Sequence, residues 1–234
     1  MGKDYFQFKQ FTIRQAGAAM KVCTDSCLFG ALAVHEYPSR ILDIGAGTGL
    51  LTLMLAQKYP KAKFTALEPH QDSYTQAKLN IEQSPWSGNI QLQQARLQDF
   101  ALKRQYKFDL IICNPPFYPA QQKNPQLNKA AHSFSLPMSE IIKASKLLLR
   151  DTGLLYVLYP PVQAEKLIKM ALTADLQVAK KLYIKNRFLE SYFRVAVALA
   201  IKEMDITIKT ITISENANYT PEFVDLMKDY YLFL

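Results

Sequence analysis

The stretch Ile41-Leu42-Asp43-Ile44-Gly45-Ala46-Gly47-Thr48-Gly49 joins a short apolar run to three closely spaced glycines. The apolar run is typical of a strand buried on both faces of a parallel sheet. The glycines let the backbone turn tightly and pass close to a ligand. The following segment, Leu50 to Tyr59, is helical in pattern and ends before Pro60. A helix that starts here would point its first free N–H groups at that ligand.

Strand and helix patterns alternate along most of the chain, which favours an α/β fold with a mostly parallel sheet and helices on both faces. The expected strands cover residues 41–44, 64–67, 90–94, 108–113, 154–159 and 176–184, and the expected helices 26–34, 50–59, 71–83, 139–150, 162–174 and 221–230. Two β-rich segments, 192–201 and 206–213, follow each other closely and are expected to form an antiparallel edge. Residues 118–136 have the polar composition of a long loop.

Composition restricts the class of protein. The chain has 234 residues and a formal charge of +8, which fits either a polyanionic partner or a merely basic protein. Its three cysteines lack the partners of a metal site, so we expect reduced thiols and no metal. The chain shows neither a signal-peptide pattern nor a membrane-spanning apolar stretch, which predicts a cytoplasmic protein without a membrane partner. It also lacks the Gly-x-Ser-x-Gly turn of α/β-hydrolases.

The second informative stretch, Asn114-Pro115-Pro116-Phe117, directly follows the apolar run Phe108–Cys113. Open α/β sheets place their chemistry at the carboxyl ends of strands, where this turn is expected. The prolines make the turn rigid. An amide oxygen and the Pro115 carbonyl would accept the two hydrogens of an exocyclic amine, and Phe117 would stack on the ring. The turn therefore predicts a site for a planar amine.

The acidic residues beside the glycines indicate the cofactor. The glycine spacing is Gly-x-Gly-x-Gly, and Asp43 precedes it. A carboxylate there would repel a pyrophosphate but suits an ammonium group. Glu68 ends the next strand about 20 residues later, where a ribose-binding carboxylate is expected. These features favour S-adenosyl-L-methionine; a nicotinamide dinucleotide, or a tight turn without a ligand, remains as an alternative.

The glycine loop, Glu68 and the Asn-Pro-Pro-Phe turn together resemble the class I, Rossmann-like, S-adenosylmethionine-dependent methyltransferases that act on planar amines. This resemblance implies a seven-stranded, mostly parallel sheet with an antiparallel edge strand. The segments Phe8–Phe11, Asn80–Trp86 and Tyr231–Phe233 are further similar to the bacterial tRNA1(Val) (adenine-37-N6)-methyltransferase family. Membership would imply methyl transfer to N6 of the adenine beside the anticodon of a valine tRNA.

The resemblance also implies roles for individual residues. The catalytic candidates are Asn114, Pro115, Pro116 and Phe117. The cofactor-binding candidates are Lys21, Thr24, Asp25, Asp43, Gly45, Gly47, Gly49, Glu68, Pro69, Arg96, Leu97 and Asn114. Thr24 or Asp25 is alternatively the N-cap of helix 26–34. Where the family commonly has an acid near the cofactor adenine, this chain has Arg96, and Asp99 comes three residues late.

We expect a single methyltransferase domain over residues 1–234. Residues 1–35 would form an N-terminal cover and cofactor-side segment, residues 36–202 the Rossmann-like core, and residues 203–234 a C-terminal strand and helix.

The expected macromolecular partner is tRNA, through its anticodon loop, whose bases are already unpaired. The candidate RNA contacts are Lys123, Lys129, Lys185, Arg187, Phe188 and Arg194, with residues 185–188 expected in an exposed turn. A solvated charged face is the alternative for these cations. The same chemistry on another planar amine (guanine N2 of ribosomal RNA, N6 of a DNA adenine, or a release-factor glutamine) stays open, as does a non-catalytic RNA-binding protein.

Overall fold

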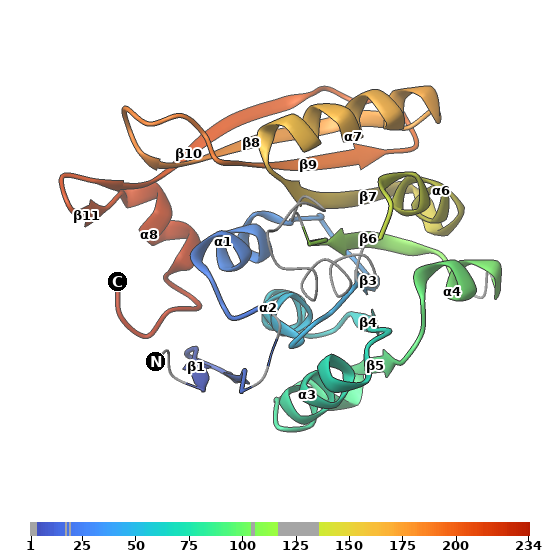
Figure 1. Ribbon diagram of the computed structural model, residues 1–234, viewed down its shortest axis with the longest axis horizontal. Helices are drawn as coiled ribbons and strands as arrows, with labels where there is room; N and C mark the ends of the chain where they lie inside the picture. The colour runs from blue at the N-terminus through green and yellow to red at the C-terminus, as the bar shows by residue number, and fades with distance from the viewer. Residues whose placement is uncertain (1–3, 17, 19, 104–105, 117–135) are drawn as a thin grey trace, which may run out of the picture.

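The structure is a computed structural model that describes residues 4–16, 18, 20–103, 106–116 and 136–234. Within them, one sheet of nine strands runs through the molecule and a small two-stranded sheet lies near the N-terminus (Figure 1). The strands of the large sheet, in spatial order, are β11 (Asn218–Tyr219), β10 (Thr207–Glu215), β8 (Gln177–Arg187), β9 (Arg194–Ala200), β7 (Leu149–Tyr159), β6 (Phe108–Cys113), β3 (Arg40–Ile44), β4 (Lys63–Leu67) and β5 (Ile90–Gln93).

Helices cover both faces of this sheet. They are α1 (Thr24–Leu32), α2 (Leu50–Lys58), α3 (Gln71–Glu82), α4 (Leu97–Lys103), α6 (Met138–Leu148), α7 (Pro161–Thr173) and α8 (Pro221–Met227), with a 3-10 turn η1 (Ser87–Asn89) before β5. The sequence analysis did not anticipate α4, which is only seven residues long. The expected α/β fold, with a mostly parallel sheet between two helical layers, is confirmed.

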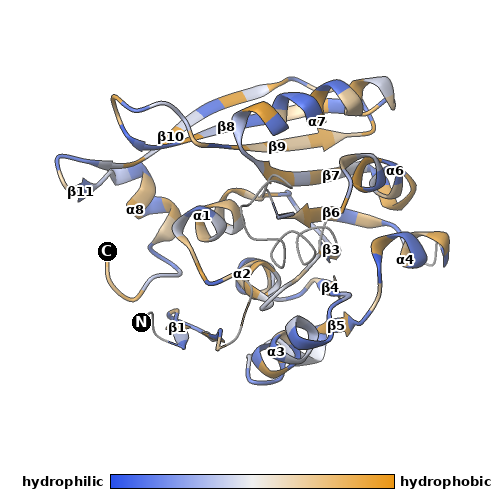
Figure 2. Cartoon of the chain, viewed as in Figure 1, coloured by the Kyte–Doolittle hydropathy of each residue, from blue (hydrophilic) through white to orange (hydrophobic). Residues whose placement is uncertain are grey.

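The core has two parts because successive strand residues point to opposite faces of the sheet. Ile41, Leu110 and Ile112 belong to the cluster under α1, α2, α3 and α8. Leu42 and Ile111 belong to the cluster under α4, α6 and α7. In Figure 2 the central strands are strongly hydrophobic, whereas α7 alternates between hydrophobic and hydrophilic residues. Strands buried on both faces therefore explain the continuous apolar runs in the sequence.

The late strands pair differently from the prediction. We expected segments 192–201 and 206–213 to pair with each other, and this was wrong. Strand β9 lies between β7 and β8 and is antiparallel to both, whereas β10 pairs with β8 in parallel. The seven strands from β5 to β8 match the expected number, and β10 and β11 extend the sheet to nine. Short-range spacing could not distinguish an edge strand from one inserted between its neighbours.

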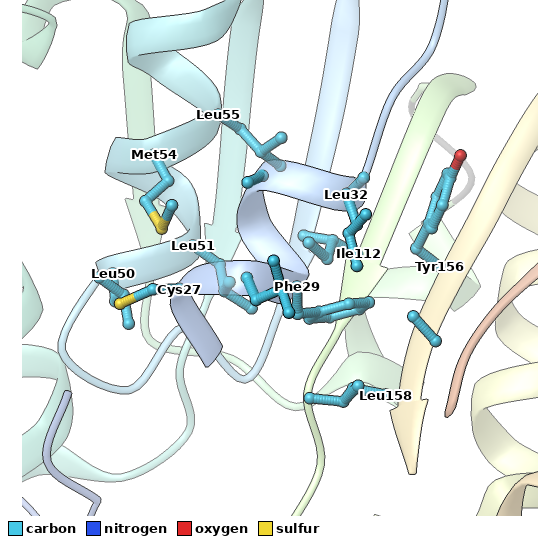
Figure 3. Packing of buried hydrophobic residues seen from close by; sticks show 14 of the residues in the cluster. Cys27, Phe29, Leu32, Leu50, Leu51, Met54, Leu55, Ile112, Tyr156 and Leu158 are labelled. Atoms are coloured by element: carbon cyan, nitrogen blue, oxygen red, sulfur yellow. The ribbon is translucent and has the colours of Figure 1, made fainter. Parts of the chain in front are cut away.

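Helix α1 packs beside α2 on one face of the sheet. Figure 3 shows Phe29 and Leu32 of α1 against Ile112 of β6 and Tyr156 of β7, and all four belong to one buried cluster. The C-terminal end of α1 is held by Lys58, whose ammonium donates to the carbonyls of Gly30, Ala31 and Ala33 at 2.6 to 3.1 Å. The N-cap of α1 is Cys23, without a side-chain hydrogen bond, so the assignment of Thr24 or Asp25 to that position was wrong.

The N-terminal segment folds back onto the domain as the hairpin β1 (Tyr5–Gln7) and β2 (Thr12–Arg14). Phe8 forms an isolated bridge with Tyr231, so the two ends of the chain lie side by side (Figure 1). Asn80 of α3, only 2% exposed, fastens this segment. Its Oδ1 accepts from the Arg14 amide at 2.9 Å, and its Nδ2 donates to the Arg14 carbonyl at 3.0 Å and the Thr48 carbonyl at 2.8 Å. Asn80 thus links the hairpin to the glycine turn.

We predict that Asn80→Ala destabilises the protein by about 1–3 kcal/mol, because buried backbone groups of two segments lose their partner. The measurement is the free energy of unfolding in urea. Gln83→Ala is the matched control, since Gln83 also links α3 to Arg14, but through an exposed contact of 3.2 Å. The control should cost clearly less, and equal costs would show that Asn80 does not hold the hairpin.

Candidate functional site

The site lies where three parallel strands end level with one another. Ile44 of β3 is in register with Leu67 of β4 and with Cys113 of β6. The next residues along the chain are Gly45, Glu68 and Asn114. Three segments far apart in the sequence therefore meet at one edge of the sheet, the position at which open α/β sheets bind ligands.

The glycine turn requires glycine because its backbone is left-handed. The φ angles are 74° at Gly45, 58° at Gly47 and 83° at Gly49. The amides of Gly45 and Ala46 both donate to the Leu67 carbonyl at 2.9 Å, which ties the turn to the neighbouring strand. Among the described residues, apart from the chain neighbours, no heavy atom lies within 4 Å of the Cβ position of Gly45 or Gly47. The Cβ position of Gly49, by contrast, lies 3.8 Å from Ala77 of α3. The first two glycines therefore leave space for a ligand, and the third serves helix packing.

Glu68 fixes the outer part of this turn. One of its carboxylate oxygens accepts from the Gly47 amide and the other from the His70 amide, both at 2.9 Å. The side chain is 4% exposed. A carboxylate has about four acceptor positions, so both oxygens retain capacity for a ligand hydroxyl.

A cavity of about 550 Å³ opens at this edge of the sheet. It brings together eight of the predicted cofactor-binding residues: Lys21, Gly45, Gly47, Glu68, Pro69, Arg96, Leu97 and Asn114. Pro116 also lines it. A cavity shared by Gly47 and Asn114 is what the predicted reaction requires, because both reactants must occupy one space.

Asn114 lines the cavity and has one unpaired side-chain atom among the described residues. Its Nδ2 donates to Ser26 Oγ of α1 at 3.1 Å. Its Oδ1 is buried and has no hydrogen-bond partner among the described residues. Buried polar atoms are almost always paired, so an unpaired one needs an explanation. Pro115 is buried and does not line the cavity, and Phe117 lies outside the described residues.

The opposite wall comes from the segment after β5. Ala95, Arg96, Leu97 and Gln98 line the cavity, and α4 starts at Leu97. Asp99, the nearest acid, is not among the lining residues. The chain therefore offers the backbone and apolar surface of residues 95–97 to a ligand at the place where the family commonly has an acid.

Asp43 lies beneath the glycine turn and is not among the lining residues. Its Oδ2 accepts from Thr52 Oγ1 at 2.6 Å. Burial raises the pKa of Asp43 to about 7, with a smaller contribution from the charge of Glu68, while the Thr52 hydrogen bonds oppose the shift. The geometry thus gives Asp43 a contact with α2 and does not place it at the expected ammonium position.

Thr24 and Asp25 also do not line the cavity. Asp25 instead forms an ion pair with Arg194 of β9, with Oδ2 2.9 Å from Nε. One residue predicted to contact the cofactor and one predicted to contact RNA are therefore partners of each other.

The structure describes only some of the remaining residues that were predicted to contact RNA. Lys185 and Arg187 belong to the end of β8, and the connection to β9 begins at Phe188, so an exposed turn over residues 185–188 was wrong. Arg187 and Phe188 are exposed, and Lys185 is half-buried. Lys123 and Lys129 lie outside the described residues. Among the described residues, no three His, Cys, Asp or Glu side chains gather as a metal site, and no described helix is long and apolar enough to cross a membrane.

Several site residues escaped the sequence analysis. Ser26, Ala95 and Gln98 line the cavity without belonging to a recognisable motif. Ala95 and Gln98 are the sequence neighbours of the predicted residues Arg96 and Leu97, so their position after β5 could have indicated them. Ser26 reaches the site only because α1 packs beside β6, and no local pattern indicates it.

We predict that the wild-type protein without ligand loses stability as the pH rises from about 4 to about 7. The folded state keeps a proton on Asp43 in this window, and the unfolded chain has released it. In Asp43→Asn this contribution is absent. Denaturant unfolding at pH 5 and pH 8 measures it: the difference in stability between wild type and variant should change with pH in this direction. Parallel pH profiles would show that Asp43 is not protonated in the folded state.

The chain matches the family model described as the methyltransferase small domain over residues 25–188. It is 38% identical to a tRNA1(Val) (adenine(37)-N6)-methyltransferase of Trichodesmium erythraeum, over 99% of each chain. A protein of the same name from Flavobacterium johnsoniae is also 38% identical, over 97% of this chain and 99% of the relative.

Solved methyltransferases share the fold. A predicted O-methyltransferase from Agrobacterium tumefaciens superposes with a TM-score of 0.66 at 19% identity, covering 87% of this chain and 95% of the other. The glycopeptide N-methyltransferase MtfA, complexed with S-adenosyl-L-methionine, gives 0.57 at 11% identity, covering 76% and 94%.

The mostly parallel sheet covered by helices agrees with these matches. By its full-length similarity to the curated relatives, the chain belongs to the family of the tRNA1(Val) (adenine(37)-N6)-methyltransferases.

Proposed function

We propose that the chain transfers a methyl group from S-adenosyl-L-methionine to the exocyclic N6 of adenine 37, next to the anticodon of tRNA1(Val). The proposal is carried by the buried Oδ1 of Asn114, which has no partner among the described residues, in a residue that shares a cavity with the glycine turn. The relatives' names supply the substrate, and the site has the acceptor that an aromatic amine needs.

The residues present fit the cofactor. The open Cβ positions of Gly45 and Gly47 allow a ligand to approach the backbone closely. Glu68 would accept from the ribose hydroxyls, and residues 95–97 would contact the adenine. Lys21 and Pro69 line the same cavity. The cofactor, when bound, supplies a methyl group on a positively charged sulfur.

The protein's contribution is to orient the acceptor nitrogen. The lone pair of an adenine amine is delocalised into the ring, which makes the nitrogen a poor nucleophile. Hydrogen bonds from the amine to Asn114 Oδ1 and to the Pro115 carbonyl would favour a pyramidal nitrogen with its lone pair directed at the methyl group. Phe117 would stack on the base, a contact worth ~1–3 kcal/mol.

The proton balance needs no dedicated base. Once methylated, the nitrogen is acidic and loses a proton to water or to a nearby carbonyl. For this reason we assign no catalytic role to His35 or His70, and His132 lies outside the described residues.

We also propose that residues 1–234 form one domain. Phe8 and Ile13 of the N-terminal segment and Phe223 and Met227 of α8 belong to the same buried cluster as the central strands. Neither terminal segment has a core of its own among the described residues.

The decisive experiment is transfer of labelled methyl from S-adenosylmethionine to a tRNA1(Val) transcript, with a transcript carrying guanine at position 37 as the control. We expect N6-methyladenosine in the first transcript only. Asn114→Ala should lower kcat by at least about a hundredfold and leave cofactor affinity unchanged, because it removes the amine's acceptor.

Asn218→Ala, at an exposed asparagine of β11, controls for the substitution itself. Methyl label in N2-methylguanosine, DNA or protein would replace the proposed substrate by that acceptor. The absence of any transfer would favour a non-catalytic RNA-binding protein. Equal loss of turnover and cofactor affinity in the Asn114 variant would make Asn114 a structural residue.

The surface for tRNA is proposed at the end of β8, where Lys185 and Arg187 lie next to the exposed aromatic side chain of Phe188. Cations neutralise phosphates and release counterions, so binding should weaken with salt. Reversing both charges, in Lys185→Glu with Arg187→Glu, should weaken tRNA binding about tenfold or more and flatten its salt dependence.

The matched control is the pair Lys166→Glu and Lys169→Glu on the exposed side of α7, which changes the net charge equally. The affinity of each double variant for tRNA is measured by filter binding at two salt concentrations. If both pairs have the same effect, overall charge attracts the tRNA and the end of β8 is not its binding surface.

A further inference from the structure

The side-chain amide of Asn114, whose oxygen is the proposed acceptor, is held through its nitrogen. Asn114 Nδ2 donates to Ser26 Oγ at 3.1 Å, and Ser26 is 5% exposed. An amide whose nitrogen is engaged in this way keeps its oxygen as the free acceptor. Ser26 Oγ also lies 3.0 Å from Cys23 Sγ, within hydrogen-bond distance. The orientation of Asn114 therefore depends on where the first turn of α1 places Ser26.

The first turn of α1 is fixed by an ion pair with the sheet. Asp25 Oδ2 accepts from Arg194 Nε at 2.9 Å, and the side chains are 13% and 25% exposed. The other oxygen, Oδ1, accepts from the Ser26 amide at 3.0 Å. One carboxylate thus connects the start of β9 to the backbone of the residue that holds Asn114.

We infer that Asp25 and Arg194 are positioning residues that set the amide of Asn114, through Ser26, so that its oxygen is presented to the substrate amine. The inference rests on the proposed function and deepens it by assigning two residues outside the cavity lining. It replaces the separate cofactor and RNA roles that the sequence suggested for them.

The geometry argues against those separate roles. Asp25 does not line the cavity, and its Oδ2 is paired with Arg194 of β9. The guanidinium of Arg194 is held within the protein: Nε donates to Asp25, Nη1 donates to the Phe193 carbonyl at 3.0 Å, and the group lies 5.2 Å from the Phe193 ring centre. A phosphate contact through Nε would require breaking the ion pair with Asp25.

The consequence for catalysis follows from hydrogen-bond polarity. An Asn114 amide that rotates by half a turn presents N–H donors, which cannot accept the amine hydrogens of the base. Loss of the ion pair should therefore lower the rate of methyl transfer, while the surfaces that bind cofactor and tRNA stay in place.

The test compares Asp25→Asn, Arg194→Gln and the double variant in the methyl-transfer assay with tRNA1(Val). We expect each single change to lower kcat about tenfold, with KM for tRNA and the Kd for the cofactor unchanged, and the double variant to be no slower than either single one. The control is Lys202→Gln, which removes the exposed Lys202–Asp151 pair of 3.1 Å. It should behave as wild type.

Ser26 connects the ion pair to Asn114, and two substitutions at this position test the connection. Ser26→Ala should reproduce the loss in kcat, and Ser26→Thr, which keeps the hydroxyl, should recover most of it. Thermal unfolding of each variant shows whether the protein is folded at the assay temperature.

A spectroscopic readout makes the test independent of turnover. The side-chain amide resonances of Asn114, assigned by their loss in Asn114→Ala, should shift in Asp25→Asn and Arg194→Gln but not in Lys202→Gln. Unchanged resonances would overturn the inference even if the wild-type protein methylated no tRNA. A raised KM for tRNA alone would restore Arg194 as an RNA contact, and weaker cofactor binding alone would restore Asp25 as a cofactor contact. Additive losses would show that the two residues act separately.

Discussion

The hydrogen bond from the Gly47 amide to Glu68 joins the glycine turn to the end of β4, and the lining of the cavity is built around it. It exists because β3 and β4 are parallel and in register, with Ile44 opposite Leu67. The left-handed glycines turn the chain back toward β4 instead of away from it. One register therefore determines both the shape of the turn and the position of the acidic side chain.

The pairing of β3 with β6, on the other side of β3, places the start of the Asn-Pro-Pro segment beside the glycine turn. Cys113 is opposite Ile44, so Asn114 emerges beside the glycine turn and not a residue earlier or later. A slip of one residue would send every side chain of β6 to the other face of the sheet. The double proline then keeps the segment after β6 from continuing as strand.

Polar side chains outside the cavity lining connect further segments to the site. Asn80 connects the glycine turn to the N-terminal hairpin, and Asp25 connects α1 to β9. Both are polar groups buried or half-buried among apolar helices, where an unpaired partner would be costly. Such contacts hold loops and helix ends that hydrophobic packing alone would leave variable. Both contacts join segments that lie far apart in the sequence.

The sequence by itself determined the α/β class, the glycine turn, Glu68 and Asn114, because each follows from a local pattern: a buried strand, a turn that needs left-handed residues, and a residue at a strand end. It did not determine that Asp43 would be buried against Thr52, that Gly49 would serve packing on α3, or that Asp25 and Arg194 would pair. It also placed β9 and β10 as neighbours, whereas β8 separates them. Only the tertiary structure decided these points, since strand order and helix packing join residues that are far apart in the chain and carry no mutual signal within it.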